Sequence, residues 1–102
     1  MKLENAAKQL EALGNTTRLS IYRTLITAGK DGCPVGVIQS KLGVPASTLS
    51  HHIAKLVQCG LVTQERDSRT LVCKSDFGNM DELMRFLLQN CCSEESCMKS
   101  GN

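Results

Sequence analysis

Hydrophobic residues recur at helical spacing through the first part of the chain. Between residues 3 and 13 they fall three or four positions apart, which predicts an amphipathic helix. Gly14 and Asn15 end that helix, and Asn15 or Thr16 is expected to cap a second one. The first helix carries an apolar stripe of Leu3, Ala6, Ala7, Leu10 and Leu13, and the expected inner face of the second helix comprises Leu19, Tyr22, Leu25 and Ile26. Residues 28–34 are expected to form a loop.

Two further helices are predicted on either side of a short turn. Residues 35–42 form the first of these, with Val35, Ile38 and Leu42 facing inward. Gly43 breaks it, and Pro45 suits the first turn of the next helix, where its missing N–H is not needed. Leu49, Ile53 and Leu56 then form a buried stripe, and Gly60 ends the helix.

After Gly60 the pattern changes from helix to strand. Residues 61–63 and 70–73 favour strands and flank the polar segment 65–69, so a β-hairpin is predicted. Asn79 with Glu82 resembles a helix-capping pair and predicts a last helix. Its apolar face would comprise Met80, Leu83, Met84 and Leu87, with Leu88 beside it.

The order of these elements is typical of a winged helix-turn-helix. We therefore expect a mainly α fold with a β-hairpin. Residues 1–89 are expected to form a DNA-binding domain, and residues 90–102 a cysteine-bearing tail. A chain of 102 residues supports one such domain.

Basic residues concentrate in the middle of the chain. Residues 16–75 carry eight basic against three acidic residues, a net charge of +5, whereas residues 76–102 carry two against five, a net charge of −3. This distribution points to a polyanion as partner of the middle segment, although an uneven surface without a partner would look the same. Aromatic residues are only 3% of the chain, which argues against a base-stacking surface for single strands.

The outer face of the helix that follows Pro45 is small, polar and weakly basic. Such a face can enter a major groove and offer donors and acceptors to base edges. The hairpin tip adds two arginines suited to phosphate or minor-groove contact. The candidate DNA-contacting residues are Ser47, Thr48, Ser50, His51, Lys55, Arg66 and Arg69. His52 lies closer to the buried stripe, so we expect it to be half-buried and hydrogen-bonded.

No apolar run is long enough to span a membrane and no signal-peptide pattern is present. We therefore expect a cytoplasmic protein without a membrane partner. Thiols stay reduced in the cytosol, so the six cysteines indicate metal binding or redox chemistry before disulfides. Cys59 and Cys73 are interpreted as buried small hydrophobes.

Two segments followed by a basic hairpin closely resemble the ArsR/SmtB family of metal-sensing repressors. They are "LEALGNTTRLSIYRTL" (residues 10–25) and "LGVPASTLSHHIAKLVQCGLV" (residues 42–62). The resemblance covers about residues 5–89. It implies a homodimer paired through its first and last helices, so residues 1–89 would serve for dimerisation as well as for DNA binding. The apolar stripes within residues 3–13 and 80–88 fit that pairing. Such a dimer binds double-stranded operator DNA and releases it when an inducer binds.

The family places inducer sites in several locations, and two of them match poorly. A Cys-Val-Cys site at the third helix corresponds here to Cys33-Pro34-Val35, which lacks the second cysteine. An Asp/His site on the last helix finds Asp81 and Glu82 but no histidine. Cys33 is either a remnant of the first site or a loop residue.

Three cysteines at the end of the chain match a third location. Some arsenite-responsive members carry an adjacent cysteine pair and a third cysteine there, which correspond to Cys91, Cys92 and Cys97. As(III) and Sb(III) are soft and three-coordinate, so three converging sulfurs satisfy them. The resemblance thus implies As(III) or Sb(III) as inducer, with no catalytic cofactor.

A thiol enzyme is disfavoured, because a helix C-terminus with Glu94 and Glu95 nearby opposes thiolate formation. The chain is therefore not expected to be an enzyme. A divalent-metal sensor (zinc, cadmium or lead) and a thiol-redox sensor of the same family remain the alternatives.

Overall fold

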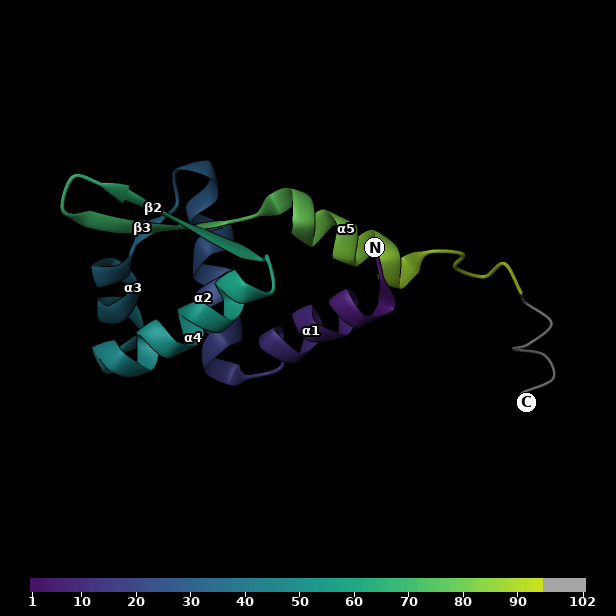
Figure 1. Cartoon of the computed structure of the whole chain (residues 1–102), viewed down its shortest axis with the longest axis horizontal. Helices are drawn as coiled ribbons and strands as arrows, with labels where there is room; N and C mark the ends of the chain where they lie inside the picture. The colour runs from purple at the N-terminus through teal and green to yellow at the C-terminus, as the bar shows by residue number, and fades with distance from the viewer. Residues whose placement is uncertain (95–102) are drawn as a thin grey trace.

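Five α-helices and a three-stranded antiparallel sheet make up residues 1–94, the part of the chain that the computed structural model describes (Figure 1). The helices are α1 (Leu3–Leu13), α2 (Thr16–Ala28), α3 (Val35–Leu42), α4 (Ala46–Gln58) and α5 (Phe77–Leu88). The strands are β1 (Cys33–Pro34), β2 (Val62–Asp67) and β3 (Thr70–Ser75), and a 3₁₀ turn, η1, covers Gly29–Asp31. The predicted mainly α winged helix-turn-helix is confirmed.

The hairpin is longer and its turn tighter than predicted. Strands β2 and β3 pair as far as Asp67 and Thr70, which leaves Ser68 and Arg69 as a two-residue loop. Ser68 has a φ of 59°, in the left-handed region that such loops require. The polar residues 65–67 therefore belong to a strand and not to the turn. Only strand pairing sets the end of β2. Both faces of this strand are exposed after Val62, so its sequence shows no alternation of apolar and polar residues.

A short third strand replaces part of the predicted loop over residues 28–34. Strand β1 pairs with β3, so the sheet order is β1-β3-β2. Two residues are too few to show a strand pattern in sequence. Gly32 permits the approach: its φ is 75°, and a Cβ there would clash with the carbonyl oxygen of Cys73.

The buried stripe of α4 is confirmed, but the inner face of α2 is rotated from the prediction. Leu49, Ile53 and Leu56 are buried as expected. In α2, Leu19 and Ile26 are 45% and 42% exposed, so their assignment to the core was wrong. Tyr22 and Leu25 are buried as predicted, and Arg18 and Ile21 complete the buried face of α2. Arg18 turns inward, where its Nε donates to the carbonyl oxygen of Ala12.

Helix α1 leaves part of its predicted apolar stripe exposed. Its buried residues are Ala6, Gln9 and Ala12, whereas Leu3 and Leu10 are exposed. The small alanines let α1 pack closely against its neighbours, and the leucines face outward. Helices α1 and α5 contact each other at one end of the molecule (Figure 1).

The N-cap of helix α5 lies three residues before the predicted cap, Asn79. Asp76 is the N-cap, and its carboxylate accepts from the backbone N–H of Asn79 at 2.9 Å. The Asn79 side chain instead donates to the carbonyl oxygen of Gly60 at 2.8 Å, so the cap assigned to Asn79 was wrong. Among the predicted apolar face only Leu83 is fully buried, and Met84, Leu87 and Leu88 are exposed.

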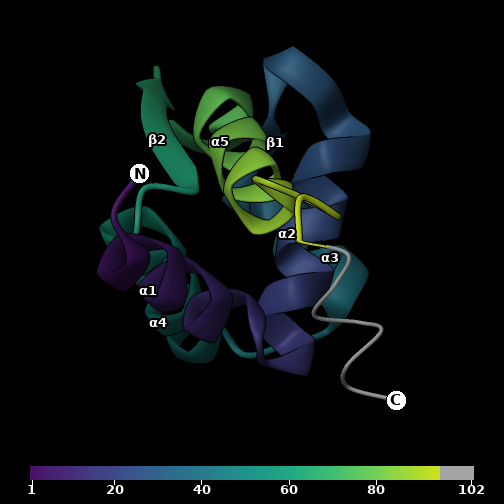
Figure 2. The same ribbon diagram turned by 90° about the vertical axis from the view of Figure 1, so that its right-hand side faces the viewer.

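The view along the long axis separates two groups of helices. Helices α1 and α4 lie on one side, α2 and α3 on the other, and α5 runs in front between them (Figure 2). Across residues 1–94, no helix combines the length and the apolar character needed to cross a membrane.

Candidate nucleic-acid interface and cysteine pair

The outward face of α4 begins directly after a tight turn. Gly43 caps α3 in the left-handed region with a φ of 64°, and its N–H donates to the carbonyl of Gln39 at 2.8 Å. Pro45 then precedes the first turn of α4. The predicted contact residues Ser47, Thr48, Ser50 and His51 are all exposed. They lie on the side of α4 away from its buried stripe.

Arg18 fastens α4 to the helices behind it. The side chain is only 9% exposed. Its Nε donates to the carbonyl oxygen of Ala12 at 2.6 Å, and its Nη1 lies 3.1 Å from Nδ1 of His52. Because a guanidinium can only donate, Nδ1 of His52 must be the acceptor. The expectation of a half-buried, hydrogen-bonded His52 is confirmed.

Burial and, next, the nearby Arg18 guanidinium lower the pKa of His52. The imidazole is therefore neutral near neutral pH, which is the form that can accept from Arg18. Sequence reasoning missed this role of Arg18. A basic residue in phase with the buried stripe of α2 was the available signal.

A second polar contact joins α1 to the end of α4. The side chain of Gln9 is 5% exposed, and its Nε2 donates to the carbonyl oxygen of Cys59 at 3.0 Å. This contact also escaped sequence reasoning, although Gln9 is in phase with Ala6 and Ala12. Helix α4 is thus held by polar contacts at its middle and at its C-terminal end, which fixes the direction of its outer face.

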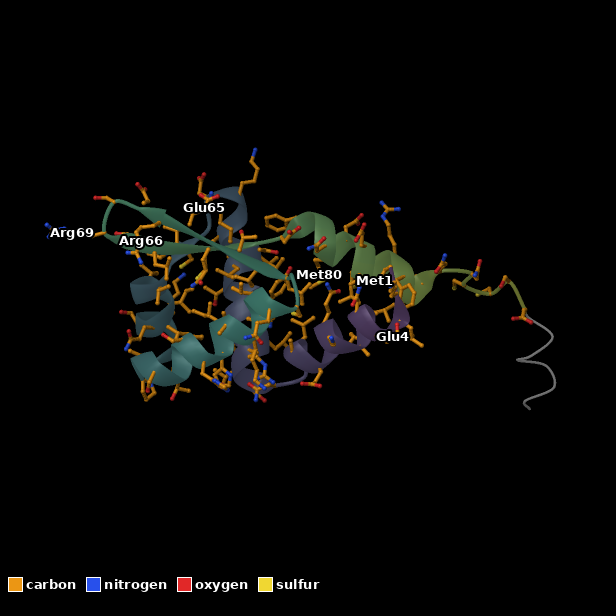
Figure 3. The ribbon with its side chains drawn as sticks, viewed as in Figure 1. Met1, Glu4, Glu65, Arg66, Arg69 and Met80 are labelled. Carbon is orange, nitrogen blue, oxygen red and sulfur yellow. The ribbon has the colours of Figure 1, made fainter. Side chains whose placement is uncertain are left out.

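The two arginines predicted at the hairpin lie at its far end (Figure 3). Arg66 and Arg69 are exposed, and neither takes part in an ion pair within residues 1–94. Nearer the base of the hairpin, Lys74 pairs with Glu65 at 2.9 Å. The hairpin tip and the beginning of α4 lie at the same end of the molecule, far from the end of α5 (Figure 1). Two arginines without an ion pair among the described residues therefore lie at the same end of the molecule as the start of α4.

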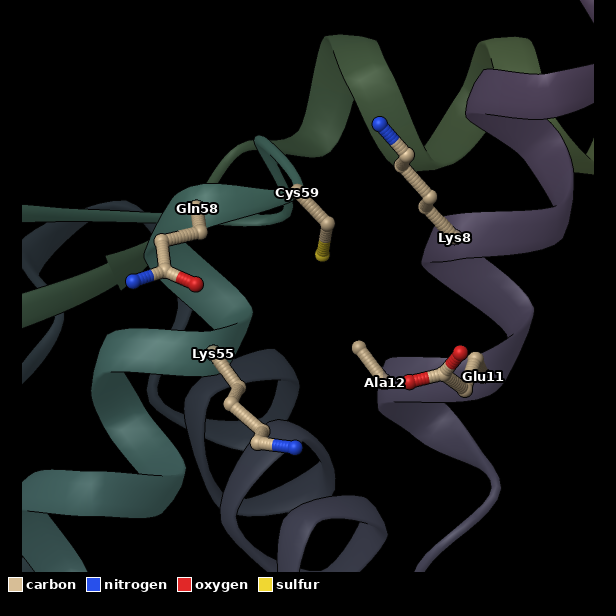
Figure 4. Close-up of a pocket in the computed structure, with 6 residues that line it drawn as sticks. All are labelled: Lys8, Glu11, Ala12, Lys55, Gln58 and Cys59. Atoms are coloured by element: carbon tan, nitrogen blue, oxygen red, sulfur yellow. The ribbon is translucent and has the colours of Figure 1, made fainter.

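Lys55 differs from the other candidate contacts. It is half-buried and lines a pocket of about 300 Å³ between α1 and α4, together with Lys8 and Glu11 (Figure 4). Its side chain extends toward α1 (Figure 4). Lys55 thus lies at the margin of the exposed face of α4 and not at its centre.

Cys91 and Cys92 occupy a turn directly after α5. Both are exposed, and their Sγ atoms lie 3.3 Å apart. Asn90 and Cys92 have φ values of 61° and 63°, and the N–H of Cys91 donates to the carbonyl of Leu88 at 2.9 Å. This tight turn brings two neighbouring thiols together. Cys97, the third predicted ligand, lies outside the described residues.

The remaining cysteines are buried or half-buried. Cys73 is fully buried, which confirms its interpretation, and Cys59 is half-buried with its Sγ 3.3 Å from the carbonyl oxygen of Leu56. Burial raises the pKa of both thiols. Cys33 is a buried strand residue and not a loop residue.

The helix pair α3–α4 followed by a β-hairpin defines a winged helix-turn-helix protein. A model of helix-turn-helix domains matches residues 13–65, about half of the chain. The putative arsenical resistance operon repressor ArsR of Halobacterium salinarum is 39% identical over 67 residues, which cover 66% of this chain and 51% of that protein. The chain belongs to the ArsR family of helix-turn-helix transcriptional regulators. This agrees with the expectation that it is not an enzyme.

Two solved structures extend the comparison. HlyU from Vibrio cholerae is 30% identical, with a TM-score of 0.66, and the match covers 85% of this chain and 97% of HlyU. The homodimeric winged helix-turn-helix domain of Mb0332 from Mycobacterium bovis shares the fold, at 24% identity and a TM-score of 0.68 over 86% of this chain and 82% of that one. The curated relatives, among them a nodulation protein of Rhizobium meliloti, are longer: the match spans 51–63% of their length.

Proposed function

We propose that the chain is a DNA-binding repressor that releases its operator when As(III) or Sb(III) binds Cys91, Cys92 and Cys97. The observation that carries the proposal is the exposed pair of sulfurs 3.3 Å apart at the end of α5. Residues 1–89 act as the DNA-binding and dimerisation domain, and residues 90–102 act as the sensing tail.

The chemistry of trivalent arsenic suits these cysteines. As(III) is thiophilic and takes three ligands on one side of a lone pair. Two sulfurs already in contact can bind one centre with little rearrangement, and Cys97 is close enough in sequence to supply the third. Arsenite enters as a neutral hydroxide, and each thiol proton leaves with a hydroxyl as water. The product is neutral, so the acidic residues nearby do little harm.

Double-stranded DNA is the proposed partner of the opposite end of the molecule. Ser47, Thr48, Ser50 and His51 would face base edges in the major groove, with Lys55 at their margin. Arg66 and Arg69 would contact phosphates or the minor groove. Their exposure and their lack of ion pairs within the described residues support this assignment.

A homodimer is proposed on the basis of apolar surface left uncovered on two adjacent helices. Leu3 and Leu10 of α1 and Met84, Leu87 and Leu88 of α5 are all exposed. Contiguous exposed apolar residues of this kind mark interaction sites. The Mycobacterium bovis domain that shares this fold is homodimeric.

The contacts of α1 suggest how the tail would affect the reading helix. Helix α5, which the cysteine pair follows, contacts α1. Helix α1 in turn holds the end of α4 through the bond from Gln9 to Cys59. A ligand that ties the tail to α5 would shift the dimer interface, and with it the spacing of the two α4 helices. Coupling of this kind is typically about 1–3 kcal/mol.

The test follows release of fluorescently labelled DNA, selected by the protein from a random-sequence library. As(III) and Sb(III) should release it at lower concentrations than Zn(II) or Cd(II). Cys91→Ser, Cys92→Ser and Cys97→Ser should each bind DNA but fail to release it. Cys59→Ser is the matched control and should respond like the parent.

Other inducers would give a different pattern. Release by zinc or cadmium at lower concentrations than arsenite would favour the divalent-metal alternative, and release by peroxide alone would favour the redox alternative. Normal arsenite response in Cys97→Ser would exclude the three-sulfur site.

A further inference from the structure

Cys33 and Cys73 face each other across two strands. They are direct partners in the antiparallel pairing of β1 with β3. Directly opposite residues of such a pair project from the same face of the sheet, with Cβ atoms about 4.5–5.5 Å apart. The two side chains are 5% and 0% exposed and belong to the same core cluster. The two cysteine side chains are therefore neighbours inside the protein.

Gly32 fixes this close approach. A side chain at this position would clash with the carbonyl oxygen of Cys73 and with the side chain of Lys74. The backbone of Gly32 therefore rests directly on β3, which holds the next residue, Cys33, opposite its partner. The backbone pairing of the sheet therefore places the two cysteines directly opposite each other.

The surroundings offer few other ligands. Within residues 1–94, no group of three His, Cys, Asp or Glu side chains could hold a metal ion. The core cluster around the pair is almost entirely apolar. The site therefore lacks the four ligands that a cation such as zinc needs. It does provide the two thiolates that are enough for a soft, two-coordinate cation.

We propose that Cys33 and Cys73 form a second, buried site for a two-coordinate thiophilic dication, for which Hg(II) is the best-fitting ion. Two thiolates neutralise a 2+ charge, and a neutral product avoids the cost of burying net charge, which a monovalent ion would incur. Each S–H bond breaks as an S–Hg bond forms, and two protons leave to solvent. No electron is transferred.

Entry to the site requires only a local opening. Strand β1 has two residues and lies at the edge of the sheet, so it can separate from β3 at lower cost than global unfolding. Because β1 leads directly into α3, a bound ion would fasten the helix-turn-helix to the wing. Binding to the folded state should raise the melting temperature.

The experiment starts from a chain that lacks the proposed metalloid ligands, Cys91→Ser/Cys92→Ser/Cys97→Ser. This variant keeps only Cys33, Cys59 and Cys73 of the six cysteines. It is incubated with mercuric chloride under anaerobic conditions with excess glutathione, which removes ions held by a single thiol. Retained mercury and melting temperature are then measured. The result does not depend on whether the arsenite proposal holds.

The background variant should retain one mercury per chain and melt at a higher temperature. Adding Cys33→Ser should abolish both effects, and adding Cys59→Ser, the matched control, should abolish neither. Cys73→Ser disturbs a fully buried position, so the edge-strand variant Cys33→Ser is decisive. Retention that survives Cys33→Ser, or that is lost in Cys59→Ser, would overturn the site.

Alkylation gives a second readout that needs no substitution at Cys33 or Cys73. The background protein, with or without mercury, is unfolded in iodoacetamide and mapped by mass spectrometry. Mercury should protect Cys33 and Cys73 and leave Cys59 alkylated. Protection of the pair before mercury is added would mean a disulfide, and would overturn the metal site in favour of a redox bond.

Discussion

Replacing Tyr22 with Phe tests whether one buried hydrogen bond fastens the wing to the helical body. Tyr22 lies in α2 and Ser75 ends β3. Their hydroxyl oxygens are 2.5 Å apart, and the two residues are 3% and 6% exposed. Neither hydroxyl forms another hydrogen bond within the described residues. Tyr22→Phe therefore leaves the Ser75 hydroxyl buried without a partner, and Ser75→Ala does the same to Tyr22.

The expected loss of stability follows because each hydroxyl has no other partner among the described residues. A buried hydroxyl left unpaired costs about 1–3 kcal/mol, so each single variant should lose that much stability. The double variant loses both hydroxyls and strands neither, so it should lose only the net value of the bond, about 0.5–1.5 kcal/mol. The coupling energy between the two positions should then be at least about 0.5 kcal/mol. Burial raises the pKa of Tyr22, so the phenol stays protonated in the assay.

Urea denaturation followed by circular dichroism measures these differences. The four proteins are compared at one concentration, because dimerisation would make stability concentration-dependent. With a denaturant slope of about 1–3 kcal/mol per molar, each single variant should lower the midpoint by roughly 1 M. Additive losses in the double variant would refute the hydrogen bond as the source of the effect. An unchanged midpoint in Tyr22→Phe would refute it as well.

Three further variants test the pH response, the sheet and the DNA interface. The pKa of His52 is lowered in the folded state, so the stability that its neutral form contributes is present above its unfolded pKa of 6.5 and is lost as pH falls below that value. His52→Gln should therefore flatten the dependence of stability on pH in this range, whereas the control, His51→Gln, should not. Gly32→Ala should lower the free energy of unfolding by more than about 1 kcal/mol, because of backbone strain and a clash with β3. Gly36→Ala, in open space within α3, should raise it by about 0.5–1 kcal/mol. Equal urea midpoints for the two variants would contradict the packing at Gly32. Arg69→Ala should weaken binding to all DNA sequences alike and lower the slope of log affinity against log salt by about 1, measured by fluorescence anisotropy; an unchanged slope would remove Arg69 from the interface.

Local signals in the sequence were enough for most of the helices and for the fold class. The Leu49, Ile53 and Leu56 stripe is long and regular, and the burial of all three confirms it. Gly43 and Pro45 mark the turn before α4, where a left-handed cap and a missing N–H are both local requirements. The hairpin also followed from composition, although its turn proved shorter than the polar segment.

Where several faces of a helix carry apolar residues, the sequence could not say which face is buried. Leu19 and Ile26 look as suitable for the core as Ile21 and Leu25, yet only the second pair is buried. The buried face also carries Arg18, whose contacts with the end of α1 and with His52 of α4 appear only in the tertiary structure. Likewise, only the tertiary structure shows that Leu3 and Leu88 remain exposed and available to a partner.

The two cysteine pairs differ in whether the sequence or the tertiary structure brings them together. Cys91 and Cys92 are adjacent in sequence, so their proximity was determined by the chain itself, and the turn at Asn90 only sets how their sulfurs meet. Cys33 and Cys73 are separated by a helix-turn-helix and most of a hairpin, and neither stood out as part of a pair. Their proximity comes from strand pairing across the sheet and from the close approach that Gly32 allows, which no local pattern encodes.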